Sequence, residues 1–187
     1  MVQTIPPDRR IRLTEELMIL LLGVKDTPIP SRFHLQKELF ILTTIKPKLK
    51  DVIIFDIYQQ GVYSQEVTYS LYNMLYYKDA VRVDNDGKIY LTTHGKEAFE
   101  SIKQEYKDSS EFKYLLKIMK MIRVMYDKLT KEEFALLLYT RYPETAKVST
   151  IIDNINTNKK EIIEALRKKG YITEERYKEL LATNINC

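Results

Sequence analysis

The sequence predicts a mainly α-helical protein with a small β wing, in which a winged-helix-type unit precedes a helical C-terminal extension. Three observations predict this fold class. Apolar residues recur at helical spacing through most of the 187 residues. One segment carries the turn residues of a β-hairpin. The hydrophobic content of 44% and the charged content of 30% are those of a folded globular chain.

The first two predicted helices lie on either side of a proline-containing connector. Thr14 is a suitable N-cap for a helix that runs to Leu22 and is ended by Gly23. Ser31 caps the second helix, which Pro47 ends because proline cannot continue the backbone hydrogen bonds. The apolar stripes expected on these helices are Leu17, Leu20 and Leu21 on the first and Leu35, Leu39 and Leu42 on the second.

The middle of the chain predicts a strand, a helix and a hairpin. The apolar and β-branched residues 52–58 favour a strand. Ser64 caps a helix over residues 65–77. Residues 80–83 and 88–91 are strand-like, and the Asp-Asn-Asp-Gly between them tolerates the positive φ of a tight turn. The inward face expected for the helix consists of Val67, Leu71, Met74 and Leu75.

The rest of the chain is predicted to be helical. Helices are expected over residues 93–107, 111–127, 131–142 and 159–169, and a short one after Thr173. Their N-caps are Thr92 or Thr93, Ser110, Thr130 in a capping box with Glu133, and Asn158. The residues expected to be buried in the first of these helices are Ala98, Phe99 and Ile102.

The order helix, short link, helix and two-stranded wing is that of a winged-helix unit. We therefore expect three parts in the chain. These are a basic N-terminal arm at residues 1–13, a winged-helix-type domain at residues 14–108 and a helical C-terminal subdomain at residues 109–187.

Composition and segment hydropathy indicate the cellular compartment of the protein. The one cysteine, Cys187, cannot form an internal disulfide, so nothing requires an oxidising compartment. The first 13 residues lack the apolar core of a signal peptide. The longest apolar run, residues 17–23, is far shorter than the ~20 residues of a membrane span. We expect a cytoplasmic protein without membrane contact, and the abundance of Lys, Glu, Ile and Tyr without Trp suggests a thermophilic source.

No residue pattern points to catalysis, a metal or a cofactor. His34 and His94 each lie near a predicted helix start, without a second ligand at metal-binding spacing. The five glycines are scattered, so no phosphate-binding loop is present. The carboxylate pairs are expected in first helical turns, where they favour the helix dipole; they are Glu15-Glu16, Glu132-Glu133 and Glu174-Glu175. We expect a protein that is not an enzyme.

The third predicted helix offers tyrosines and amides where a DNA reader would offer cations. Seven of the fourteen tyrosines lie between Tyr58 and Tyr90, and tyrosine is enriched in the energetic centres of protein interfaces. Core packing of about half of them is the competing interpretation. The residues expected to bind a protein partner are Tyr63, Gln65, Tyr69, Tyr72, Asn73 and Tyr76.

Duplex DNA is the alternative partner. The net charge of +4 arises from two basic flanks, since residues 1–50 and 111–187 each carry +4 and residues 51–110 carry −4. Basic arms can enter a minor groove, and lysines can contact phosphate. The residues expected to contact DNA in this alternative are Arg9, Arg10, Arg12, Lys46, Lys48, Lys50, Arg82 and Lys88.

Four segments within residues 14–150 resemble the Panacea-type proteins, which contain the SocA-like antitoxin domain. They are His-Leu-Gln-Lys-Glu-Leu-Phe-Ile-Leu at 34–42, Phe-Asp-Ile-Tyr-Gln-Gln-Gly-Val-Tyr-Ser at 55–64, Tyr-Leu-Thr-Thr-His-Gly-Lys-Glu-Ala-Phe at 90–99, and Leu-Thr-Lys-Glu-Glu at 129–133 with Tyr-Pro-Glu at 142–144 and Ser149. Val62 replaces the family's proline, which removes a fixed φ from that turn.

The resemblance implies a non-enzymatic regulatory module that binds another protein, as an antitoxin or as an adaptor for proteolysis. A DNA-binding winged-helix transcription regulator, expected to be a homodimer, is the alternative that the element order keeps open.

Overall fold

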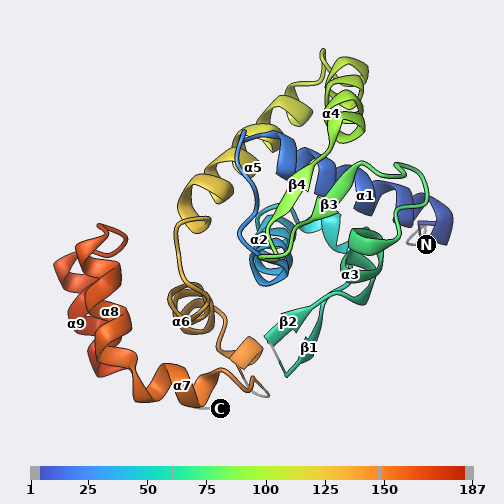
Figure 1. Cartoon of the computed structure of the whole chain (residues 1–187). Helices are drawn as coiled ribbons and strands as arrows, with labels where there is room; N and C mark the ends of the chain where they lie inside the picture. The colour runs from blue at the N-terminus through green and yellow to red at the C-terminus, as the bar shows by residue number, and fades with distance from the viewer. Residues whose placement is uncertain (1–4, 60, 147–148, 184–187) are drawn as a thin grey trace. The chain divides into compact units, whose positions relative to one another are not determined.

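The structure, a computed structural model, describes residues 5–59, 61–146 and 149–183. These residues are mainly helical and contain two short antiparallel hairpins (Figure 1), which confirms the predicted mainly α fold class. The chain forms two compact units. The first comprises Met1–Phe55 and Ser64–Asp127, and the second comprises Asp56–Tyr63 and Lys128–Cys187.

The first unit contains five α-helices, a 3-10 helix and one hairpin within the described residues. In chain order they are α1 Pro7–Gly23, α2 Arg32–Ile45, η1 Pro47–Asp51, α3 Gln65–Tyr72, β3 Val81–Val83, β4 Ile89–Leu91, α4 Thr93–Glu105 and α5 Ser110–Tyr126. In the hairpin, Val81 pairs with Leu91 and Val83 with Ile89. Gly87 has the positive φ of 79° that the predicted turn requires.

The second unit joins a hairpin to the C-terminal helices. In chain order its elements are β1 Asp56–Tyr58, β2 Gly61–Tyr63, α6 Lys131–Arg141, η2 Pro143–Ala146, α7 Ile152–Thr157, α8 Lys159–Lys168 and α9 Glu174–Ala182. Helix α6 contacts α7 and α8, and β2 contacts η2. The sequence did not predict α7, whereas α6, α8 and α9 lie close to their predicted positions.

Helix α1 is the central helix of the first unit. Residues 14–22 are all buried, and α1 contacts α3, α4, α5 and β4. Figure 1 shows α1 passing behind the β3–β4 hairpin. A helix that is apolar around its whole circumference has to be enclosed on all sides. The predicted stripe of Leu17, Leu20 and Leu21 is therefore only part of its buried surface.

The helix start predicted after Thr14 is wrong, because α1 begins at Pro7, within the segment 1–13 that the sequence assigned to a basic arm. Proline suits the first helical position, since its missing N–H would have no partner there. Thr14 lies inside the helix, where its hydroxyl donates to the carbonyl of Arg10 at 3.0 Å. Residues 7–13 thus form the exposed or half-buried first turns of α1, while residues 1–4 lie outside the described residues.

The predicted helix caps are largely confirmed. Ser31, Ser64 and Thr92 accept backbone N–H groups in the first turns of α2, α3 and α4. Thr130 and Glu133 form the expected capping box at α6. Ser109, one residue before the predicted cap, caps α5.

Gly95 explains the close approach of α4 to the hairpin. A Cβ at this position would lie 2.0 Å from the carbonyl oxygen of Ala80, so only glycine fits. Of the residues expected to be buried on α4, Ile102 is buried, while Ala98 and Phe99 are half-buried.

The strand predicted over residues 52–58 is wrong for most of its length. Only Asp56–Tyr58 is a strand. The N–H groups of Val52 and Ile53 both donate to the carbonyl of Leu49 at 3.0 Å. Val52 and Ile53 are therefore buried from a helical turn, and their apolar character did not distinguish a turn from a strand.

The division into units differs from the predicted domain boundaries of 14–108 and 109–187. Helix α5 belongs to the first unit because it packs against α1 and α2. The β1–β2 hairpin belongs to the second unit, although it precedes α3 in the chain.

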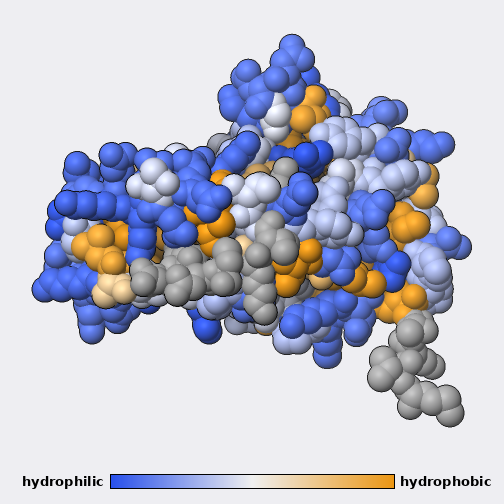
Figure 2. All heavy atoms as spheres, turned by 90° about the horizontal axis from the view of Figure 1, so that it is seen from below, coloured by the Kyte–Doolittle hydropathy of each residue, from blue (hydrophilic) through white to orange (hydrophobic). Residues whose placement is uncertain are grey.

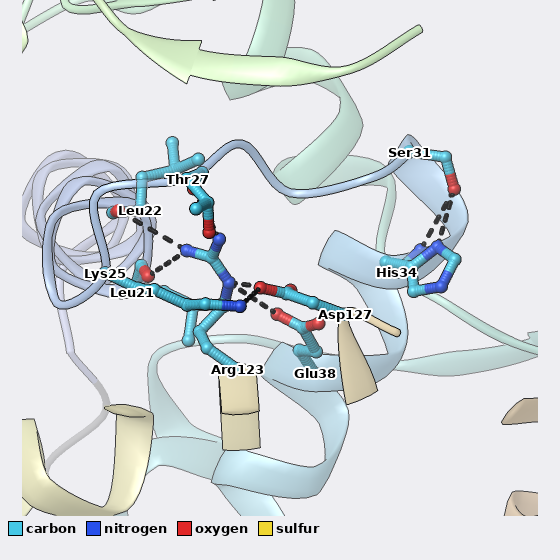
Figure 3. A network of polar contacts seen from close by, with 9 residues as sticks. All are labelled: Leu21, Leu22, Lys25, Thr27, Ser31, His34, Glu38, Arg123 and Asp127. Atoms are coloured by element: carbon cyan, nitrogen blue, oxygen red, sulfur yellow. Dashed lines mark hydrogen bonds and ion pairs between the residues drawn. The ribbon is translucent and has the colours of Figure 1, made fainter. Parts of the chain in front are cut away.

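A buried arginine joins α1, the α1–α2 connector and α5 (Figure 3). The guanidinium of Arg123, which is fully buried, donates to the carbonyls of Leu21 at 2.8 Å and Thr27 at 2.7 Å. Its Nε donates to Asp127 at 2.8 Å, and Lys25 donates to the other carboxylate oxygen of Asp127 at 2.6 Å. One cation thus satisfies backbone acceptors and a carboxylate that would otherwise be costly to bury.

Glu38 of α2 completes this cluster. Its carboxyl group is fully buried and lies 3.7 Å from Nε of Arg123. Burial raises the pKa of Glu38 well above its usual range, and the neighbouring negative charge of Asp127 raises it further. The raised pKa favours the neutral carboxyl form of Glu38 beside Arg123 and Asp127.

Arg123→Met is expected to destabilise the protein strongly. It leaves Asp127 with Lys25 as its remaining donor and removes the donor of the carbonyls of Leu21, Leu22 and Thr27. Breaking a buried ion pair on one side typically costs about 3–5 kcal/mol. Urea unfolding measures the difference. Lys103→Met, which removes the exposed pair with Glu100, is the control and should change stability little. Equal stability of the two variants would contradict the assigned role of Arg123.

Glu38→Gln is expected to become more stable relative to the wild type as the pH rises from 4 to 8. The raised pKa of Glu38 means that the folded state binds a proton that the unfolded state releases above about pH 4.3. Wild-type stability therefore falls as pH rises through this window. The neutral amide has no such dependence. Urea unfolding at several pH values measures the free energy of unfolding of both proteins. The difference between them would not change with pH if Glu38 were ionised in the folded state.

Candidate functional site

Helix α3 is shorter than predicted. It ends at Tyr72 instead of residue 77, and the N–H of Asn73 makes its last helical hydrogen bond, to Tyr69, at 2.9 Å. The predicted inward position of Leu75 is wrong, since this side chain is 49% exposed. Met74 is half-buried, while Val67 and Leu71 are buried as predicted.

A buried carboxylate from α1 explains why α3 ends there. Glu15 accepts hydrogen bonds from the backbone N–H groups of Leu75, Tyr76 and Tyr77 at 2.7, 2.9 and 3.1 Å. In a longer helix these donors would bond to carbonyls one turn earlier. Hydrogen bonds to a charged acceptor are about twice as strong as those between neutral groups. Glu15 therefore fixes residues 75–77 in a non-helical turn.

Glu16 binds the side chain of Tyr77, the last residue of the same turn. Its carboxylate accepts from the hydroxyl of Tyr77 at 2.8 Å and from Nε of Arg12 at 2.9 Å. Burial and the hydrogen bond to Glu16 raise the pKa of Tyr77 to about 12, so Tyr77 stays a hydroxyl donor at neutral pH. The two adjacent glutamates of α1 thus bind the backbone and a side chain of one turn.

The expected role of Glu15 and Glu16 is therefore wrong. They lie in the third turn of α1 and not in its first turn. The sequence contains one signal for Glu15, because it precedes the apolar Met18 and Leu22 by three and seven residues and so shares their buried face. The pairs Glu132-Glu133 and Glu174-Glu175 lie in first helical turns, as expected.

The turn and the end of α3 present a group of exposed aromatic and aliphatic side chains, which we call the tyrosine surface. Its members are Tyr69, Tyr72, Leu75 and Tyr76, with exposed fractions of 53%, 57%, 49% and 47%. Gln65 and Asn73 of the predicted set are also exposed. Three of the seven tyrosines between Tyr58 and Tyr90 are half-buried, namely Tyr63, Tyr77 and Tyr90, so packing of about half of the seven stays compatible with the structure.

Tyr63 is separate from the tyrosine surface. It lies in β2, in the second unit. Its ring makes an edge-on contact with Tyr58, with 5.5 Å between the ring centroids. We therefore leave Tyr63 out of the candidate site.

Exposed aliphatic residues do not form a broad patch on the face that Figure 2 shows. Hydrophobic side chains occur there in small groups between hydrophilic ones. The exposed tyrosines differ chemically from these small hydrophobic groups, because each tyrosine offers a large apolar ring and a polar hydroxyl.

Most cations of the DNA alternative are engaged by neighbouring side chains. Arg10 pairs with Glu66 of α3, and Arg12 pairs with Glu16. Lys46 and Lys88 each lie 3.6 Å from a carboxylate, of Glu111 and Asp86 respectively. The guanidinium of Arg82 lies over the ring of Tyr90 at 5.2 Å.

The remaining cations of the DNA alternative lie apart from carboxylates. Among the described residues no carboxylate lies within 4.0 Å of Arg9, Lys48 or Lys50. The eight cations thus do not form one continuous set of unpaired charges.

The described residues contain no group of three or more His, Cys, Asp or Glu side chains that could hold a metal ion. His34 is buried, and its ring Nδ1 lies 2.9 Å from the hydroxyl of Ser31 (Figure 3). His94 is exposed in the first turn of α4. Within the described ranges, no helix combines the length and apolar character needed to cross a membrane.

Glu15→Gln is expected to loosen the turn beneath the tyrosine surface. The amide offers one acceptor oxygen and brings an NH2 group toward N–H donors, and each buried donor left unpaired costs about 1–3 kcal/mol. Hydrogen exchange at the amides of residues 75–77 should become faster than in wild type. Glu97→Gln, at an exposed position on α4, is the control. Unchanged exchange at these amides in folded Glu15→Gln would contradict the assignment.

Comparisons of the chain with protein-family models, with curated proteins and with solved structures each gave no match.

Proposed function

We propose that this chain is a non-enzymatic regulatory protein that binds another protein through the tyrosine surface. The observation that carries the proposal is the exposure of Tyr69, Tyr72 and Tyr76 above a turn held by the buried Glu15. A tyrosine buries a large area and loses little side-chain freedom on binding. Because the underlying backbone is fixed, binding does not require the turn to be ordered first.

The proposed architecture of the first unit is a winged helix. Helices α1, α2 and α3 are followed by the β3–β4 hairpin, which is the element order of such a unit. In this assignment α3 is the third helix and the hairpin is the wing. The Panacea-like segments agree with this order and favour an antitoxin-like or adaptor-like role over a catalytic one.

DNA binding is the weaker candidate. In winged-helix readers the third helix approaches the bases, and affinity depends on cations that neutralise phosphates. Helix α3 has no lysine or arginine, and its Glu66 engages the nearest candidate cation, Arg10. Arg9, Lys48, Lys50 and Arg82 are the candidate cations that favour DNA, since none of them has a carboxylate within 4.0 Å among the described residues.

Tyr69→Ser combined with Tyr72→Ser is expected to abolish partner binding without unfolding the protein. Loss of one interface tyrosine at an energetic centre costs about 2 kcal/mol or more, which is about a thirty-fold loss of affinity. The measurement is quantitative pull-down from a lysate of the source cells, with the partner identified by mass spectrometry. Tyr58→Ser, at a position that is 50% exposed in the second unit, is the matched control.

Two outcomes would contradict the proposal. One is equal recovery of the same partner by the double variant and the control. The other is the absence of any protein partner together with a gel shift of duplex DNA that weakens steeply with salt. The second outcome would establish the DNA-binding candidate.

A further inference from the structure

An apolar groove lies on the first unit, away from the tyrosine surface in the sequence. Its volume is about 480 Å³, which is within the range of about 300–1,000 Å³ of sites that take small molecules or side chains. It is lined by the end of α2, by η1 and by the start of α5. The lining residues are Ile45, Lys46, Pro47, Lys48, Leu49, Ser109, Glu111, Phe112 and Leu115.

Backbone and side-chain contacts fix both walls of the groove. On one side, the carbonyl of Leu49 accepts the N–H groups of Val52 and Ile53 at 3.0 Å. On the other side, Ser109 caps α5 by accepting the N–H of Phe112 at 3.1 Å. The groove is therefore formed before anything binds. Its floor is accessible, because Leu115 and Phe112 are only half-buried and Ile45 is 42% exposed.

Two lysines, Lys46 and Lys48, and one carboxylate, Glu111, are among the residues that line the groove, and further lysines are near them in the sequence. Residues 45–51 and 109–117 carry five lysines and two carboxylates. The lysines are Lys46, Lys48, Lys50, Lys113 and Lys117, and the carboxylates are Asp51 and Glu111. In the part of the chain that the structure describes, only Lys46 of these five has a carboxylate within 4.0 Å. The first turn of α5 adds the positive end of a helix dipole.

We propose that this groove binds a short acidic peptide segment of a protein partner, which inserts one or two bulky apolar side chains between η1 and α5. The apolar lining provides the place for the side chains, and the lysines complement carboxylates on both sides of them. This site is additional to the tyrosine surface, with which it shares no residue. A protein with two such surfaces can contact two partners, or two segments of one.

Charge and shape favour a peptide over two other anions. A phosphate backbone would be attracted by the same lysines, but it has no apolar group for Ile45, Leu49 and Phe112. A fatty acid has an apolar chain, but a groove in which Ile45 stays 42% exposed would leave part of that chain in water. A peptide covers such a rim with its own flanking residues.

The test is a titration of the full-length, ¹⁵N-labelled protein with synthetic acidic peptides, followed by NMR. The peptides carry a central Phe-Leu, Ile-Leu or Met-Phe pair flanked by glutamates. We expect shifts at the amides of residues 45–51 and 109–117, with dissociation constants on the order of 10–100 µM. Affinity should fall with added salt.

Two substitutions in the groove, one control substitution and two control peptides make the test specific. Ile45→Glu introduces a carboxylate at an exposed position and should weaken binding at least about tenfold. Lys48→Glu should weaken binding of the glutamate peptides, while Lys78→Glu, an exposed position after α3, should leave it unchanged. Peptides with lysines in place of the glutamates, or with Ser-Ser in place of the apolar pair, should not bind.

Three results would overturn the proposal. The first is the absence of shifts with every acidic peptide at millimolar concentration. The second is equal binding of the lysine-flanked or Ser-Ser peptides. The third is a response of the same amides to duplex DNA or to decanoate but not to the peptides, which would assign the groove to a nucleic acid or to a fatty acid instead.

Discussion

The buried guanidinium of Arg123 is the interaction on which the first unit depends. It joins the last turn of α1, the connector to α2 and the end of α5 through contacts with Leu21, Thr27 and Asp127. Removing either charge would leave a buried group uncompensated, so the cluster is stable only when it is complete. The buried Glu38 lies 3.7 Å from Nε of Arg123, and its burial raises the pKa of its carboxyl group. The cluster therefore fixes α1, the helix that the other elements surround.

Fixing α1 also fixes the surface proposed for binding. Glu15 extends from α1 to three backbone N–H groups after α3, and Glu16 binds the hydroxyl of Tyr77. The result is a rigid turn with Leu75 and Tyr76 outside and no cation on α3. A rigid, aromatic and cation-poor surface is suited to a protein partner. Of the cations considered for DNA, Arg10, Arg12, Lys46 and Lys88 are paired with carboxylates, and Lys48 lines the apolar groove beside the start of α5.

Local features of the fold could be predicted from the sequence, whereas features that depend on distant partners could not. The caps at Ser31, Ser64 and Thr92 and the β3–β4 turn involve neighbours within a few residues. The end of α3 depends on Glu15, which precedes its partners by 60 to 62 residues. Arg123 contacts carbonyls 96 to 102 residues away. Of the candidate site, the three tyrosines of α3 and its following turn were predicted, but the carboxylate that positions them was assigned to a helix dipole.

The central claim is that the tyrosine surface contacts a protein in the cell. The most direct measurement is photo-crosslinking in the source cells, with p-benzoylphenylalanine placed at position 72 in one strain and at position 58 in another. We predict a discrete protein adduct from position 72 that is absent from position 58, since Tyr72 lies in the tyrosine surface and Tyr58 does not. Adducts that are equal at both positions, or that form only with nucleic acid, would contradict the account.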